Sequence, residues 1–371
     1  MSVLRPARAG IPALLTLVSA LAPGAPAGAQ PPAAPVFEER VEVTEVLLDV
    51  LVTDRDGNVI LGLKPGDFKI SEDGRPVEVT GARFYSNRRF LESASASKVG
   101  VDPSEVPQDR YFIVFLDDQR QASFDVPELM PRQLAAGRDA ARWARTGLEP
   151  GDWLAVASFD TKLRLHQDFT RDREAAAAAI ERAARGAEPP AAWPSRTSGE
   201  TAPSLAAHLP PTARELRDQT PKIYDALAVL ADASAAIEGR KNLMLFTIGF
   251  GRTNDFGLFV PDERFYRPMM ERLNAANVAV YPIDLVPVGT RHPFSDSGNL
   301  LASDTGGKFL YDVLDFSVPL GEVARQNNGY YLVSFKSPHP AKATGFQDVE
   351  VRLASPEFRA VTRKGYRFGS G

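Results

Sequence analysis

Oxygen-bearing residues follow several of the apolar runs in this sequence, where strands are expected to end. The set consists of Asp117, Asp118, Asp160, Thr247, Gly249 and Asp284, and Thr220 joins it from just before a predicted helix. Oxygen donors of this kind suit hard cations such as Mg²⁺ better than zinc. Adjacent carboxylates repel each other unless a cation or a hydrogen-bond donor lies between them. The pair Asp117–Asp118 is therefore the part of the set that most favours a bound cation.

The sequence contains few signs of a hydrolase, metalloprotease or dinucleotide-binding site. The four histidines are His166 and His208, which have no obvious partner, and His292 and His339, which lie in proline-flanked segments typical of solvated side chains. Neither a Gly-x-Ser-x-Gly nor a His-Glu-x-x-His motif is present. Residues 249–254 begin like a dinucleotide-binding fingerprint, but Asn254 replaces its third glycine. An enzyme that uses strand-end carboxylates, or a nucleotide at the same sheet edge, is the alternative hypothesis.

The composition narrows the possible functions further. The chain has 371 residues, which corresponds to two or three domains. It has no cysteine, so disulfides, thiolate metal sites and cysteine nucleophiles are excluded. Its 43 basic and 47 acidic side chains nearly balance, and no long basic run is present. This balance argues against nucleic acid as the main partner.

The N-terminal residues have the pattern of an export signal. Arg5 and Arg8 precede the apolar stretch 11–22, and the small residues 27–29 form a cleavage site. The apolar stretch is shorter than the roughly 20 residues that a membrane-spanning helix needs, and no later stretch approaches that length. The sequence therefore predicts that residues 1–29 are a signal peptide and that the mature protein is secreted or periplasmic, with no transmembrane segment.

Period-two and helical patterns divide the rest of the chain. Residues 30–36 form a proline- and alanine-rich linker, and residues 37–95 predict a β domain of about four antiparallel strands. Residues 329–369 predict three further antiparallel strands, the last of them at 360–368. We expect these to pack with the N-terminal strands as one β-sandwich-like domain. A separate C-terminal hairpin unit is the alternative.

Residues 108–328 alternate between apolar runs and helical patterns. Strands are predicted at 111–116, 153–159, 163–165, 243–248, 278–283 and 309–311. Helices are predicted at 130–148, at 170–185 with Thr170 as its cap, from 221 to 237, at 261–276 and around 320–324. This alternation predicts a doubly wound, mostly parallel α/β sheet with helices on both faces. Ligands bind such sheets at the carboxyl ends of the strands.

The order of these elements resembles that of a von Willebrand factor A-type domain. More narrowly, the chain from about 36 to 369 is similar to the secreted bacterial "VWFA-related domain" family common in acidobacteria. The segments that carry the resemblance include VLLDVLVTDRDGNVILGLKPGDFKISEDG (46–74), YFIVFLDD (111–118), LEPGDWLAVASFD (148–160), TPKIYDAL (220–227), KNLMLFTIGFG (241–251), NVAVYPIDL (277–285) and NNGYYLVSFKSP (327–338).

The resemblance implies a metal-ion-dependent adhesion site, or MIDAS. In the family, an Asp-x-Ser-x-Ser loop, a threonine and a third-loop aspartate bind the divalent cation. Asp117 matches the first aspartate and Thr220 matches the threonine. The departures from the motif are Gln119 and Gln121 at the two serine positions and Ile248 at the third-loop acid. With Asp118 as a substitute ligand, the expectation is a degenerate site that binds Mg²⁺ or Mn²⁺ weakly or not at all.

These observations together predict a non-enzymatic module for protein interaction or adhesion. Its partner is expected to be a protein or a cell-envelope polymer, bound at the rim formed by the carboxyl ends of the parallel strands. Because the metal motif is incomplete, recognition is expected to depend on rim loops, including 187–213 and 250–262.

Overall fold

The computed structural model describes residues 44–86, 109–118, 129–189, 203–290, 292–339 and 345–368. The predicted signal peptide and the linker 30–36 lie outside these residues, as do Gln119 and Gln121. Within the described residues, no helix has both the length and the apolar character that crossing a membrane requires.

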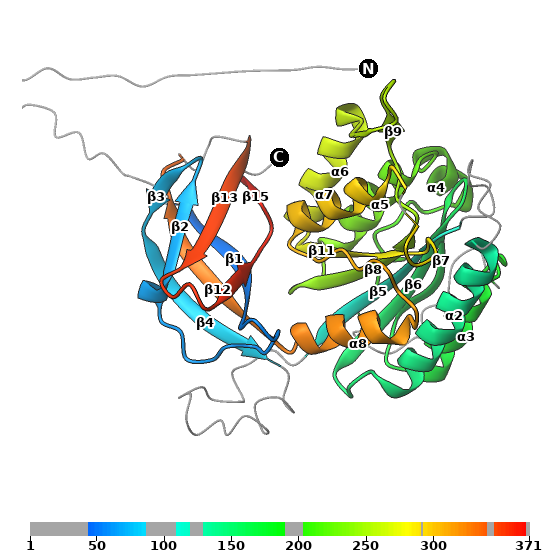
Figure 1. Ribbon diagram of the computed structural model, residues 1–371, viewed down its shortest axis with the longest axis horizontal. Coiled ribbons are helices and arrows are strands. Elements are labelled where there is room, and N and C mark those ends of the chain that lie inside the picture. The colour runs from blue at the N-terminus through cyan, green and yellow to red at the C-terminus, as the bar shows by residue number, and fades with distance from the viewer. Residues whose placement is uncertain are drawn as a thin grey trace, which may run out of the picture. The chain divides into compact units, whose positions relative to one another are not determined.

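A five-stranded mixed sheet forms the centre of the α/β region (Figure 1). Its order is β11-β8-β5-β6-β7, and its strands are β5 (Arg110–Asp117), β6 (Asp152–Phe159), β7 (Leu163–Thr170), β8 (Lys241–Thr247) and β11 (Val278–Asp284). All neighbours are parallel except β6 and β7. β5, β6, β8 and β11 are buried almost throughout, which explains why they appear in the sequence as apolar runs without period two.

Helices cover both faces of this sheet, as the sequence predicts (Figure 1). One face carries α2 (Leu129–Thr146), α3 (Arg173–Ala184) and α8 (Ser317–Gln326). The opposite face carries α4 (Ala213–Gln219), α5 (Ile223–Ser234), α6 (Glu263–Ala275) and α7 (Ser295–Thr305). Each face has its own cluster of buried apolar side chains. The prediction of an α/β sheet flanked by helices is confirmed.

Strands from both ends of the chain share two antiparallel sheets. The first has the order β14-β1-β12-β4, with β1 (Thr44–Thr53), β4 (Val79–Ser86), β12 (Gly329–Ser337) and β14 (Arg359–Val361). The second has the order β15-β13-β2-β3, with β2 (Phe68–Glu72), β3 (Arg75–Val77), β13 (Gly345–Leu353) and β15 (Gly365–Phe368), and a 3₁₀ turn (Pro65–Asp67) precedes β2. β12 lies between β1 and β4, so the C-terminal strands do not pair only with each other. Side chains of both sheets form one buried apolar cluster.

Several predicted elements differ from the structure. The N-terminal strands do not make one sheet, because β1 and β4 belong to the first sheet and β2 and β3 to the second. The single strand predicted at 360–368 is two short strands in different sheets, and the strand predicted at 309–311 is reduced to one bridge between Leu310 and Ile283. The N-terminal cap of α3 is Asp172 rather than Thr170. The Asp172 carboxylate accepts hydrogen bonds from the backbone amides of Glu174 and Ala175 in the first turn.

Polar contacts connect the antiparallel sheets to the α/β region. The Arg363 guanidinium donates to the carbonyls of Asn274 and Leu47, at 3.0 and 2.9 Å. The next residue, Lys364, pairs with Asp304 at 2.7 Å. The Asn277 amide donates to the Asp49 carboxylate. These contacts join β1 and the segment after β14 to α6, to α7 and to the turn that follows α6.

The α2–α3 contact depends on small side chains, because a Cβ on Gly137 would overlap the methyl group of Ala184. We expect Gly137→Ala to lower the free energy of unfolding by about 1–3 kcal/mol through overpacking. Gly321→Ala on α8 is the matched control, because nothing lies within 4 Å of its added methyl group. It should raise that free energy by about 0.5–1 kcal/mol through helix propensity. Urea denaturation measures both, and equal effects would contradict the packing account.

Candidate interaction rim

Asp117 and Thr247 meet at the carboxyl ends of the neighbouring strands β5 and β8. The Thr247 hydroxyl donates to Asp117 Oδ2 at 2.6 Å, and it accepts from the Gly249 amide at 2.9 Å. Gly249 has a φ of +84°, and a Cβ there would meet the Phe294 carbonyl oxygen. The Asp117 carboxylate is therefore held by a hydrogen-bond chain within the protein.

Asp118 points away from Asp117, because successive side chains of a strand face opposite sides of the sheet. Its carboxylate is buried and accepts from Gln133 Nε2 of α2 at 3.2 Å. Gln133 also donates to the Ala184 carbonyl of α3 at 3.0 Å. Each aspartate of the pair thus has its own donor, and no shared cation is needed to relieve their repulsion.

Thr220 lies at the end of α4 and is fully buried. Its hydroxyl donates to the Leu216 carbonyl at 2.7 Å and accepts from the Leu163 amide, at the start of β7, at 3.0 Å. These bonds join α4 to β7. Because Leu163 pairs with Phe159, and Phe159 with Asp117, Thr220 lies at the same edge of the sheet as Asp117.

The candidate metal ligands that the structure describes do not fit a metal site. Asp117, Asp118 and Thr220 each have hydrogen-bond partners within the protein, and Ile248, at the third-loop position, is buried among apolar side chains. Within the described ranges, no three His, Asp or Glu side chains group closely enough to hold a metal ion. Because Gln119 and Gln121 lie outside these ranges, weak Mg²⁺ or Mn²⁺ binding stays a prediction.

Asp160 is neutralised by a neighbouring cation. Arg164 pairs with Asp160 at 2.5 Å and with Glu188 at 2.9 Å. Burial opposes ionisation of Asp160, but the hydrogen bonds from Arg164 and Thr161 and the charge of Arg164 together outweigh it and lower the pKa of that carboxyl to about 2. The hydrogen bond from Arg164 likewise lowers the pKa of Glu188 to about 2. Asp160 is therefore part of an internal ion-pair network.

Three histidines have partners that the sequence analysis missed. His339 Nε2 lies 3.4 Å from the Glu72 carboxylate, and its ring stacks on Phe368. His292 Nε2 lies 3.1 Å from the Asp284 carboxylate, so this histidine is not simply solvated.

His166 Nε2 lies 2.7 Å from the Ser158 hydroxyl, and both residues are buried. The expectation that His166 has no partner is wrong. The contact was missed because the strand was predicted to end at 165, whereas β7 continues to Thr170 and pairs antiparallel with β6, which contains Ser158.

The most exposed apolar side chains of the rim lie on the hairpin formed by β9 (Arg252–Thr253) and β10 (Phe259–Val260), hereafter the rim hairpin (Figure 1). Phe256 is 87% exposed and Leu258 is 63% exposed. The Asn254 side chain accepts from both of their backbone amides at 3.0 Å, which fixes the tip. The hairpin lies within the 250–262 loop that the sequence analysis selected.

Packing below the rim hairpin fixes its base. Tyr224 of α5 packs edge-on against Phe250 with 5.0 Å between ring centroids, and it lies 5.9 Å from Phe265 of α6. Asp262 pairs with Arg264 at 2.9 Å and with Arg252 at 3.8 Å. The apolar tip therefore stands on an ordered base and does not have to be organised when it binds.

Burial, reinforced by Arg164 and Arg182, lowers the pKa of His166 from 6.5 to about 4. Between these values the unfolded chain binds more protons than the folded one, so stability should rise with pH over this interval. We expect His166→Gln to flatten the dependence of the urea midpoint on pH between about 4 and 6.5. His208→Gln, at an exposed histidine, is the matched control. A slope that His166→Gln leaves unchanged would contradict this assignment.

No family model and no curated protein sequence matches the chain. Among solved structures, a von Willebrand factor type A protein from Catenulispora acidiphila is similar at 10% identity and a TM-score of 0.38, over 90% of this chain and 74% of that one.

Two further structures have the same level of similarity. BatB from Bacteroides thetaiotaomicron is 14% identical over 59% of this chain and 98% of that one, with a TM-score of 0.35. Proximal thread matrix protein 1 from the mussel byssus, with a zinc-occupied MIDAS motif, is 14% identical over 58% of this chain and 47% of that one, with a TM-score of 0.34. The solved structures similar to this chain thus include von Willebrand factor A proteins, all at TM-scores below 0.4.

Proposed function

We propose that the mature chain is an exported, non-enzymatic interaction module that binds a protein or cell-envelope polymer at its rim, with the rim hairpin as the principal contact. The observation that carries the proposal is the exposure of Phe256 and Leu258 on a tip that Asn254 holds in place. Large apolar side chains that are exposed on a preorganised surface are typical of binding sites.

The polar residues of the rim support a non-enzymatic role. A catalytic acid or base needs a proton-transfer atom that a substrate can reach. Here the carboxylates of Asp117, Asp118 and Asp160 have donors within the protein. We propose further that the degenerate metal motif contributes little to binding and that the two antiparallel sheets form one β-sandwich-like domain, into which the α/β domain is inserted.

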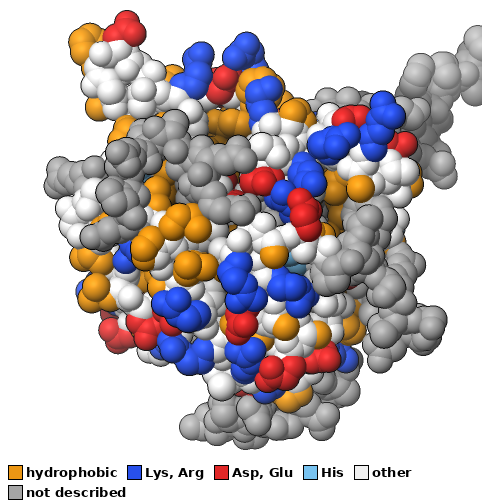
Figure 2. All heavy atoms as spheres, turned by 90° about the vertical axis from the view of Figure 1, so that its right-hand side faces the viewer, with side chains coloured by type: hydrophobic (Ala, Val, Ile, Leu, Met, Phe, Trp, Pro, Cys, Tyr) orange, Lys and Arg blue, Asp and Glu red, His pale blue; other side chains and the backbone are white. Residues whose placement is uncertain are grey.

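The charge distribution supports a protein partner rather than nucleic acid. Figure 2 shows basic and acidic side chains interspersed on the face that it draws. On α2 and α3, for example, Arg145 pairs with both Glu174 and Glu181. Such a surface lacks the continuous positive field that attracts a polyanion.

We expect the double variant Phe256→Ser, Leu258→Ser to weaken binding to the partner at least about tenfold, because the apolar anchors are lost. The measurement is retention of the purified chain by immobilised envelope proteins, and by isolated cell-wall polymer, from the producing cell. Leu47→Ser is the control, because it makes the same kind of change at an exposed apolar residue of β1, outside the rim. Full retention of the hairpin variant, or equal loss in the control, would contradict the proposal.

For the metal motif, we expect calorimetric titration with Mg²⁺ and Mn²⁺ to show no binding tighter than about 100 μM, the weak end of the range for protein sites for hard cations. Asp117→Ala should leave the titration unchanged. Tighter binding that disappears in Asp117→Ala would show that residues outside the described ranges complete a working site.

A further inference from the structure

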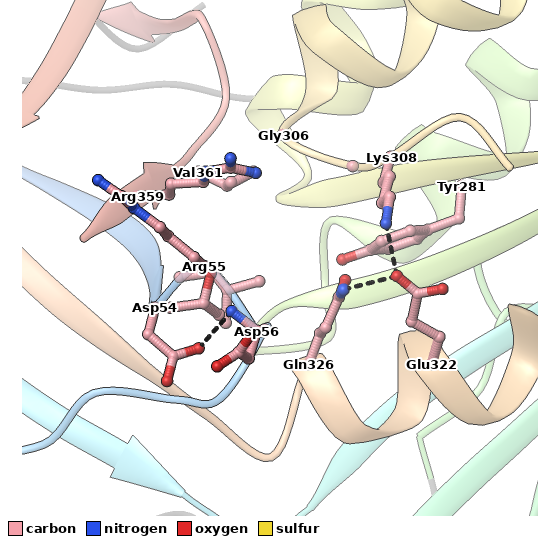
Figure 3. A pocket seen from close by; sticks show the side chains of 14 residues that line it. Asp54, Arg55, Asp56, Tyr281, Gly306, Lys308, Glu322, Gln326, Arg359 and Val361 are labelled. Atoms are coloured by element: carbon pink, nitrogen blue, oxygen red, sulfur yellow. Dashed lines mark hydrogen bonds and ion pairs between the residues drawn. The ribbon is translucent and has the colours of Figure 1, made fainter. Parts of the chain in front are cut away.

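Two neighbouring hollows lie along α8. The first, of about 350 Å³, lies between the turn at 53–57, β14, the segment 306–308 and α8 (Figure 3). The second, of about 470 Å³, is more open and follows residues 308–319. Lys308 and Glu322, whose side chains pair at 2.5 Å, line both hollows. The hollows therefore adjoin at this ion pair, and together they are hereafter called the α8 groove.

The end of the α8 groove near residue 314 is apolar. Leu314 is 83% exposed, and Tyr311 and Val318 beside it are also mostly exposed. They are three of the six large apolar residues of the described ranges that are more than half exposed. The cluster lies apart in sequence from the rim hairpin and is not used by the function proposed above. Its concave lining could hold one large apolar side chain.

The same end is negatively charged. Asp312, Asp315 and Glu322 line it, and Lys308 is the basic residue among its described lining. Lys308 pairs with Glu322, whereas Asp312 accepts from the Gly289 amide and Asp315 accepts from Ser317 and Arg142. The charge of the lining is complementary to Lys or Arg residues that flank the apolar side chain of a partner.

The other end of the α8 groove carries exposed guanidinium groups. Arg55 and Arg359 both line it, and neither forms an ion pair with another described residue. Asp54, also in the lining, accepts from Asn58 and from the Asp56 amide within its own turn. Asp56 also lines this end and is exposed. The end therefore offers an acidic group of a partner two guanidinium groups that form no ion pair within the described part of the chain.

The length of α8 sets the spacing between the two ends. Its 10 residues span about 15 Å, which four or five residues of an extended chain would cover. We propose that the α8 groove binds an extended segment of a partner protein. In this segment a large apolar residue flanked by Lys or Arg contacts Leu314 and Val318, and an acidic residue four or five positions away contacts Arg55 and Arg359.

The test uses two fluorescent peptides of equal length and the purified full chain. The complementary probe is Arg-Leu-Arg-Ser-Ser-Asp-Asp, and the reversed-charge probe is Glu-Leu-Glu-Ser-Ser-Lys-Lys. The two probes share the leucine and both serines at the same positions, so they differ only in the sign of their charges. Fluorescence anisotropy at low salt should show binding of the first probe at least about tenfold tighter than that of the second.

Variants locate the binding. Leu314→Asn and Arg359→Gln should each weaken binding of the complementary probe, the former by about tenfold. Leu258→Asn on the rim hairpin is the matched control and should leave this binding unchanged. Because these side chains are exposed, the fold should be retained, which circular dichroism checks.

Equal binding of the two probes, no binding up to about 1 mM, or an affinity that Leu314→Asn leaves unchanged would overturn the proposal. Loss of binding in Leu258→Asn alone would place the probe at the rim hairpin and would overturn it as well. Because the rim-hairpin variants are scored in a separate assay, failure of this proposal and failure of the proposed function are distinguishable.

Discussion

Polar side chains at the ends of buried strands must find partners, because an unpaired buried polar group costs about 1–3 kcal/mol. At the rim of this sheet those partners come from the chain itself. Thr247 donates to Asp117, Gln133 donates to Asp118, and Arg164 pairs with Asp160. The side chains that suggest a cation site in the sequence therefore form hydrogen bonds and an ion pair that involve β5, β8, α2 and β7.

This constraint determines which parts of the rim are available to a partner. With the polar groups engaged internally, the features left for recognition are exposed apolar side chains on fixed supports. The rim hairpin has this character, since Asn254 holds its tip and Tyr224 packs beneath its base. The α8 groove combines the same kind of apolar exposure with a charge pattern, so the binding that we propose there depends on the charges of the partner as well.

Local pattern was sufficient to predict most of the α/β region. The apolar runs at 111–116, 153–159, 243–248 and 278–283 mark strands buried on both faces, and each falls within a strand of the central sheet or overlaps one. α7 was missed because its sequence, SDSGNLLASDT, has weak helix propensity and no marked apolar stripe. The division of the N-terminal strands between two sheets depends on pairing with β12 and β13, more than 200 residues away, which local pattern does not encode.

The site was less predictable than the fold, because a residue's role depends on what lies beside it. The sequence predicted that Asp117, Thr220 and Thr247 lie at one edge of the sheet. It could not show that the side-chain oxygens of these residues form hydrogen bonds with neighbouring strands, as Thr247 does with Asp117 and Thr220 with the Leu163 amide. For His166 the partner, Ser158, is a side chain of the neighbouring antiparallel strand, and β7 was predicted too short to include that histidine.

The most direct test of this account is the stability of Asp117→Ala, measured by urea denaturation with and without millimolar Mg²⁺. If the Asp117 carboxylate is a structural acceptor, the variant leaves the Thr247 hydroxyl without it and should be destabilised by about 1–3 kcal/mol, with no effect of Mg²⁺ on either protein. A variant more stable than the parent, or a parent that Mg²⁺ stabilises while the variant does not respond, would show instead that the carboxylate is kept for a cation.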